Sequence, residues 1–141
     1  RKFGLLEAND EDNSLINEFL ELLYTNKKDY HRSMRQLSSK SGHTLGNNFD
    51  SWFVRYKARL EKETSKINQR VTMMHKVNPK YVLRNYLAEV AIRKAEDLNE
   101  YDEIETLFQL LKKPFDSHDG YESYDSEPPE WAQNLELSCS S

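Results

Sequence analysis

The feature that most constrains the fold is a set of large apolar side chains at helical spacing between residues 49 and 60. They fall at i, i+3, i+4, i+7 and i+11, which places them on one face of an α-helix. The five are Phe49, Trp52, Phe53, Tyr56 and Leu60. The basic residues among and after them are expected largely off this face: Arg55, Lys57, Arg59 and Lys62. This segment must therefore be an amphipathic helix that buries an aromatic face.

The remaining apolar spacing is helical as well, and no strand-like alternation occurs. A broad stripe at 15–23 predicts a helix capped by Asn13 or Ser14, and a weaker helix is expected at 28–37. Asn78 and Pro79 read as the start of a helix reaching about residue 97, with Leu83, Leu87, Val90 and Ala91 on one side. The chain thus predicts an all-α, irregular domain of about five or six helices over residues 1–115.

The last of these helices is delimited by charge. Asp102 and Glu103 favour the positive end of a helix dipole, Lys112 and Lys113 favour the negative end, and Pro114 prevents continuation. Its predicted inward face consists of Ile104, Leu107, Phe108 and Leu111. Beyond it, residues 116–141 are acidic and rich in Ser, Asp, Tyr and Pro, which predicts an extended tail that Trp131 and Leu135 pin to the core.

Several classes of protein are disfavoured by composition. No apolar run approaches the roughly 20 residues of a membrane-spanning helix, so no membrane association is predicted. A single cysteine, Cys139, allows no disulfide within the chain and no cysteine-rich zinc site. Between residues 51 and 95 there are eleven Lys/Arg and three Asp/Glu, which raises nucleic-acid binding as an alternative. The acidic tail and the net charge of −4 argue against it, and we predict no nucleic-acid partner.

A search for catalytic motifs nominates no residue. The glycine-rich loop that lets backbone N–H groups reach phosphates is missing, since neither Gly42 nor Gly46 precedes a Lys-Ser/Thr pair. The four histidines have no i, i+4 pair that could hold a metal on one helix face. We therefore assign no catalytic, cofactor-binding or metal-binding residue to this chain. Cys139, on a polar end segment, is accessible to oxidation or exchange.

Three stretches together resemble the C-terminal part of the selenoprotein O family. They are FDSWFVRYKARL at 49–60, VNPKYVLRNYLA at 77–88 with its continuation to 115, and PPEW at 128–131 followed by LELSCSS at 135–141. Members of that family have a kinase-like fold and transfer AMP from ATP to protein hydroxyls, using Mg. The resemblance implies that this chain is the non-catalytic helical part of such an enzyme, because the family's nucleotide, metal and catalytic residues lie upstream of the matching stretches.

The resemblance also implies partners and one functional residue. The expected partners are the kinase-like domain of the parent chain and the parent's protein substrates. In the family, the residue matching Cys139 is Cys or selenocysteine and can pair with an upstream Cys, which is absent here. Cys139 is therefore predicted to be redox-sensitive. Arg1 in place of Met indicates a cut from something longer, and a processed mature chain would look the same. Bacterial cytoplasm, or alternatively a mitochondrion, is the expected compartment.

An alternative function, as a protein-interaction module and not as part of an enzyme, stays open. The chain would then be an independent helical module that docks a partner through the face formed by Trp52 and Tyr56.

Overall fold

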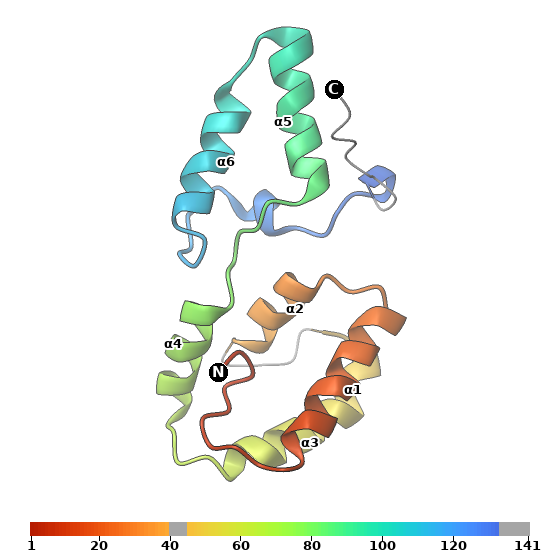
Figure 1. Cartoon of the computed structure of the whole chain (residues 1–141), viewed down its shortest axis with the longest axis vertical. Helices are drawn as coiled ribbons and strands as arrows, with labels where there is room; N and C mark the ends of the chain where they lie inside the picture. The colour runs from red at the N-terminus through yellow and green to blue at the C-terminus, as the bar shows by residue number, and fades with distance from the viewer. Residues whose placement is uncertain (40–44, 133–141) are drawn as a thin grey trace. The chain divides into compact units, whose positions relative to one another are not determined.

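The computed structural model describes residues 1–39 and 45–132, which form α-helices joined by loops and short 3₁₀ turns (Figure 1). These ranges contain six α-helices and no strand, so the predicted all-α class is confirmed. The chain divides into two compact units, Arg1–Pro79 (unit 1) and Lys80–Ser141 (unit 2). Our predicted division at residue 115 was drawn from composition and stays a prediction. In the described ranges, no helix has the length and apolarity needed to cross a membrane.

Unit 1 holds four helices, three of which correspond to the segments predicted at 15–23, 28–37 and 49–60. They are α1 (Asp12–Thr25), α2 (Tyr30–Leu37), α3 (Asp50–Glu61) and α4 (Ile67–Val77), with a 3₁₀ turn at Asn47–Phe49 before α3. The predicted cap of the first is wrong, because α1 begins at Asp12 and both Asn13 and Ser14 lie inside it. The start of α2 is fixed by Asp29, whose Oδ1 accepts a hydrogen bond from the Arg32 N–H at 2.7 Å.

The core of unit 1 is aromatic and is built where α1 and α3 lie side by side (Figure 1). Trp52 stacks on Tyr56 with ring centroids 4.8 Å apart, and Phe19 of α1 packs 4.6 Å from Trp52. The polar ends of both large rings are satisfied by carbonyls. Trp52 Nε1 donates to Leu15 O at 2.8 Å, and Tyr56 OH donates to Phe3 O at 2.7 Å. The predicted aromatic face is therefore the centre of unit 1.

Unit 2 is a helical hairpin of α5 (Asn85–Leu98) and α6 (Asp102–Lys112), which lie side by side (Figure 1). The turn between them begins at Asn99, whose left-handed φ of 55° ends α5. A small core holds the hairpin together and consists of Tyr86, Leu87, Ala91 and Leu107. Residues 115–132 follow with two 3₁₀ turns, Glu122–Asp125 and Glu130–Ala132, and Tyr124 and Ala132 pack against that core.

Two helix predictions in this region are wrong. Asn78 does not start a helix, because its buried side chain belongs to unit 1, where Nδ2 donates to Lys2 O at 2.8 Å and to Ser38 Oγ at 3.0 Å. The chain then runs without helix to Arg84, and the N–H groups of Lys80 and Tyr81 donate to Pro114 O. As a result α5 begins seven residues after Asn78, at Asn85, and Leu83 is exposed.

The inward face of α6 also differs from the prediction. Leu107 and Leu110 are buried, whereas Ile104 and Phe108 are 44% and 56% exposed. The helix is thus rotated so that half of the predicted core stripe faces outward. At the end of the described tail, the Trp131 ring meets Tyr86 edge-on at 6.3 Å while remaining largely exposed. Leu135, the other predicted anchor, lies outside the described residues.

Candidate functional site

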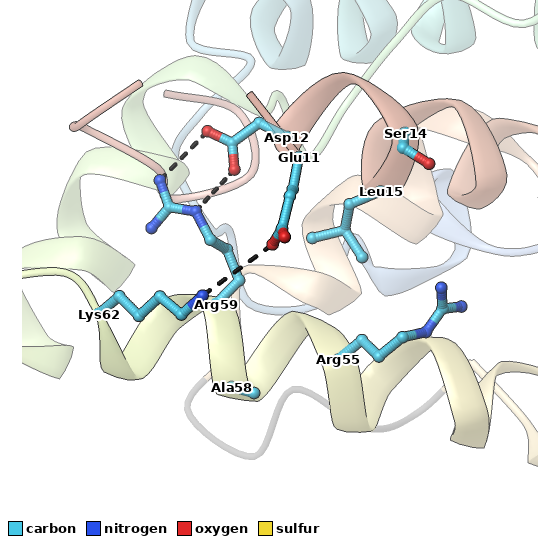
Figure 2. A pocket seen from close by; sticks show the side chains of 8 residues that line it. All are labelled: Glu11, Asp12, Ser14, Leu15, Arg55, Ala58, Arg59 and Lys62. Atoms are coloured by element: carbon cyan, nitrogen blue, oxygen red, sulfur yellow. Dashed lines mark hydrogen bonds and ion pairs between the residues drawn. The ribbon is translucent and has the colours of Figure 1, made fainter. Parts of the chain in front are cut away.

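The main concentration of opposed charges in unit 1 lines a hollow of about 400 Å³ between the start of α1 and the second half of α3 (Figure 2). Its lining residues are Glu11, Asp12, Ser14, Leu15, Arg55, Ala58, Arg59 and Lys62. Three of them are cations within two turns of one helix. Because these three cations could bind an anion such as a phosphate, the hollow is the candidate binding site in unit 1.

Arg59 occupies the inner end of the hollow, where its side chain is only 7% exposed. Figure 2 shows its guanidinium reaching across to Asp12 at the start of α1. Arg59 Nε donates to Asp12 Oδ1 at 2.6 Å and Nη2 donates to Asp12 Oδ2 at 3.1 Å, so the pair is bidentate. These hydrogen bonds from Arg59 hold the pKa of the Asp12 carboxyl below its ordinary value.

The same guanidinium contacts two further groups. Its Nη2 donates to the carbonyl of Glu7 at 2.5 Å, and its Nη1 lies 2.8 Å from Oε1 of Glu63, which follows the end of α3. The Glu63 side chain is 1% exposed, and its Oε2 accepts hydrogen bonds from the Leu6 and Glu7 N–H groups at 3.0 and 3.4 Å. Residues 6–12 are therefore held to the end of α3 and the residue pair that follows it by Arg59, Asp12 and Glu63, which we call the Arg59 cluster.

The outer cations of the hollow have carboxylate partners too. Arg55 forms an ion pair with Glu18. Figure 2 shows the second pair, in which Lys62 Nζ lies 4.0 Å from Glu11 Oε2. All three lining cations thus face carboxylates. A phosphate entering the hollow would have to displace these partners and would meet their negative charge, so the geometry favours a structural role over anion binding.

Unit 2 contains a second cluster of the same kind, centred on Glu103 of α6. Lys94 Nζ of α5 lies 2.7 Å from Glu103 Oε2, and the Tyr124 hydroxyl donates to Glu103 Oε1 at 2.6 Å. Burial acts to raise the pKa of Glu103, but the bonds from Lys94 and Tyr124 outweigh it and hold that pKa below its ordinary value. Burial, reinforced by the bond to Glu103, raises the pKa of Tyr124 to about 12. This carboxylate joins both helices to the tail segment.

The predicted functional positions fall in three places. Cys139, the predicted redox residue, lies outside the described residues. The face formed by Trp52 and Tyr56 is wrong as a docking surface, because the two residues are 1% and 2% exposed in the core of unit 1. Arg59, which we expected on a solvated polar face, is buried because Asp12 and Glu63 neutralise it.

Sequence reasoning missed the carboxylates of the Arg59 cluster. The i, i+4 spacing of Arg59 and Glu63 was available as a signal for that pair. Asp12 carries no such signal, since it is 47 residues away from Arg59. In the ranges that the structure describes, no three His, Cys, Asp or Glu side chains come together as a metal site would need.

Comparison with known proteins gives the context for these observations. The model of the family described as protein adenylyltransferase SelO matches residues 1–113, which includes every described helix except the last turns of the tail. The chain belongs to this family. The SelO match takes in both the Arg59 cluster of unit 1 and the α5–α6 hairpin of unit 2.

Relatives of this chain carry the name protein nucleotidyltransferase YdiU. The protein of Burkholderia multivorans is 41% identical over 152 aligned residues, which cover 99% of this chain and 29% of the relative. That of Thiobacillus denitrificans is 42% identical and covers 99% and 31%, and that of Burkholderia vietnamiensis is 41% identical and covers 99% and 29%. The chain therefore spans about three tenths of the length of the curated relatives it matches.

Proposed function

We propose that this chain is a non-catalytic helical part of a protein adenylyltransferase, an enzyme that transfers AMP from ATP to Ser, Thr or Tyr hydroxyls of proteins. The longer polypeptide in which it would act is called the parent protein below. Family membership supports the class of reaction. The chain covers only 29% of the Burkholderia multivorans relative, which is consistent with an auxiliary role within a longer enzyme.

The observation that carries the non-catalytic role is the internal pairing of charge. Arg59 donates four hydrogen bonds or ion-pair contacts to Asp12, Glu7 and Glu63, and so it has little capacity left for a phosphate. Glu103 is similarly held between Lys94 and Tyr124. Both clusters fix the helices of their own unit, which is the chemistry of a scaffold. ATP and Mg would be bound by the kinase-like domain of the parent protein.

The experiment that tests this role is a comparison of three proteins with labelled ATP, Mg and a protein acceptor. The first is the 141-residue chain, the second is the full-length Burkholderia multivorans relative, and the third is that relative with this chain in place of its matching segment. We expect no label transfer by the chain and transfer by the other two. Transfer by the chain alone would place catalytic residues here and refute the proposal.

A deletion provides the control for the exchange. The Burkholderia multivorans relative lacking its matching segment should lose solubility or activity, because the rest of the enzyme would have lost its helical support. If the deleted relative transferred AMP as well as the intact one, a supporting role for this region would be excluded.

We also propose that Cys139 is a redox latch in the parent protein. Its thiol and the thiol of an upstream Cys would form a disulfide and reduce a low-molecular-weight disulfide to two thiols, and the reverse exchange would release the tail. Cys139→Ser in the parent protein should abolish the difference in activity between oxidised and reduced samples. An equal difference in wild type and variant would rule the latch out. Bacterial cytoplasm remains our proposal for the compartment.

A further inference from the structure

Helix α6 carries an apolar face that the hairpin core does not use. Tyr101, the N-cap residue of α6, and Ile104 and Phe108 within the helix are 61%, 44% and 56% exposed, and we call these three the α6 stripe. They stand at i, i+3 and i+7, which puts them on the same side of the helix. The buried residues Leu107 and Leu110 lie on another side. The α6 stripe is therefore a second apolar surface of this region, separate from the face that packs in the core.

The area of the stripe decides what kind of partner it suits. With roughly 200 Å² for a full side chain of this size, the three residues expose on the order of 300 Å². A stable interface between separate proteins buries about 800 Å² on each partner. The stripe is too small to hold a free partner by itself, but a tethered surface binds at a high effective concentration and needs far less area.

Charge disfavours a second copy of this chain as the partner. Residues 80–141 contain six Lys/Arg and fourteen Asp/Glu, a formal net charge of −8. Two copies meeting at α6 would bring these like charges together. Asp102 and Glu105 border the stripe near the start of α6, while Lys112 Nζ lies 5.1 Å from the Phe108 ring centroid near its end. A complementary surface would be apolar with cations opposite Asp102 and Glu105.

We propose that the α6 stripe is the docking face for an apolar, cation-bordered surface of the same polypeptide, located in the roughly seven tenths of the relatives' length that this chain does not span. This inference rests on the proposed function only in that the chain acts within a longer protein. It adds which face of the helical part makes the contact and what chemistry receives it. Such docking would explain why the aromatic rings of Tyr101 and Phe108 are both exposed in this chain.

The test is hydroxyl-radical footprinting of the 141-residue chain and of the parent protein under the same conditions. Oxidation of Tyr101 and Phe108 should be on the order of fivefold slower in the parent protein, because a docked surface excludes water. Tyr24 of α1, which is 88% exposed, serves as the matched control and should be oxidised equally in both. Equal oxidation of the stripe in both proteins would overturn the proposal.

Two further measurements separate the other occupants. Protection that rises with protein concentration would mean a second copy, and would overturn docking within one polypeptide. In the parent protein, Ile104→Gln combined with Phe108→Gln should return the oxidation rate of Tyr101 towards that of the free chain, since Gln keeps the helix but removes the apolar contact. Failure of that variant to expose Tyr101 would also count against the proposal. Neither readout depends on AMP transfer, so each proposal can fail alone.

Discussion

Replacing Arg59 with Met is the most direct perturbation of unit 1, because it removes a buried cation while keeping much of its bulk. The guanidinium is bidentate to Asp12 and pairs with Glu63 at 2.8 Å. Its removal leaves two largely buried carboxylates without their counter-charge, and it also frees the carbonyl of Glu7. The fastening of residues 6–12 to α3 should therefore be lost.

The magnitude follows from the burial of the pair. Breaking a buried ion pair by removing one partner costs about 3–5 kcal/mol. A unit of 79 residues has a free energy of unfolding of roughly 4–12 kcal/mol, so Arg59→Met should remove about a quarter or more of the stability of unit 1. Arg55→Met is the matched control one turn away on α3. The Arg55 and Glu18 side chains are 52% and 37% exposed, and losing their pair should cost no more than about 1 kcal/mol.

Urea unfolding followed by tryptophan fluorescence is a suitable assay, in a Trp131→Phe background that leaves Trp52 as the reporter of unit 1. The cost of Arg59→Met should be fully present above about pH 4 and should shrink as acid protonates Asp12, since a depressed carboxyl pKa stabilises only above it. If Arg59→Met destabilised unit 1 no more than Arg55→Met, the cluster would not be the fastening that its geometry indicates.

Three further predictions concern single side chains. Gly4→Ala should destabilise unit 1 by about 1–3 kcal/mol in urea, because at φ +74° its Cβ would lie 2.7 Å from a side chain, whereas Gly120→Ala, with φ +85° and open space, should cost only its backbone strain. Tyr124→Phe should cost about 1.5–3 kcal/mol by removing a donor to a carboxylate, against less than about 0.5 for the exposed Tyr121→Phe, measured by circular dichroism. Burial, aided by the nearby Arg35, lowers the pKa of His75 in the folded protein. The unfolded chain therefore binds a proton more readily, and stability should fall as pH drops below about 6.5. His75→Gln should reduce this fall in a profile of melting temperature against pH.

The helices of unit 1 were predictable because their apolar spacing and their packing agree. The helical spacing of Phe49, Trp52 and Tyr56 was enough to predict α3, and all three are at most 2% exposed in the structure. Local pattern sufficed there because the residues that share the helix face also share the core. The charges that open and close α6 were equally readable from the sequence.

The wrong predictions concern positions whose structure depends on residues far away in the sequence. Asn78 has the appearance of a helix cap, but its amide is taken by Lys2 O and Ser38 Oγ, 76 and 40 residues away. On α6, four apolar residues were compatible with more than one inward direction. The bonds of Glu103 to Lys94 and Tyr124 accompany an orientation that leaves Ile104 and Phe108 outside. Neither outcome can be read from spacing, because each depends on contacts that form only in the folded unit.

The hydrogen bond from Asn78 to Lys2 has a consequence for the order in which unit 1 assembles during synthesis. Within unit 1, residues 1–11 are synthesised before Tyr56, Arg59, Glu63 and Asn78, to which they make hydrogen bonds. Phe3 can already pack on Phe19 of α1, but the hydrogen bonds of the segment cannot form until α3, α4 and Asn78 have been translated. A chain stalled before residue 78 would keep this segment open to chaperones and proteases, and release of the next few residues would close it. We therefore expect the docking of residues 1–11 to be a late folding step, delayed by translation and by the loop that it must close.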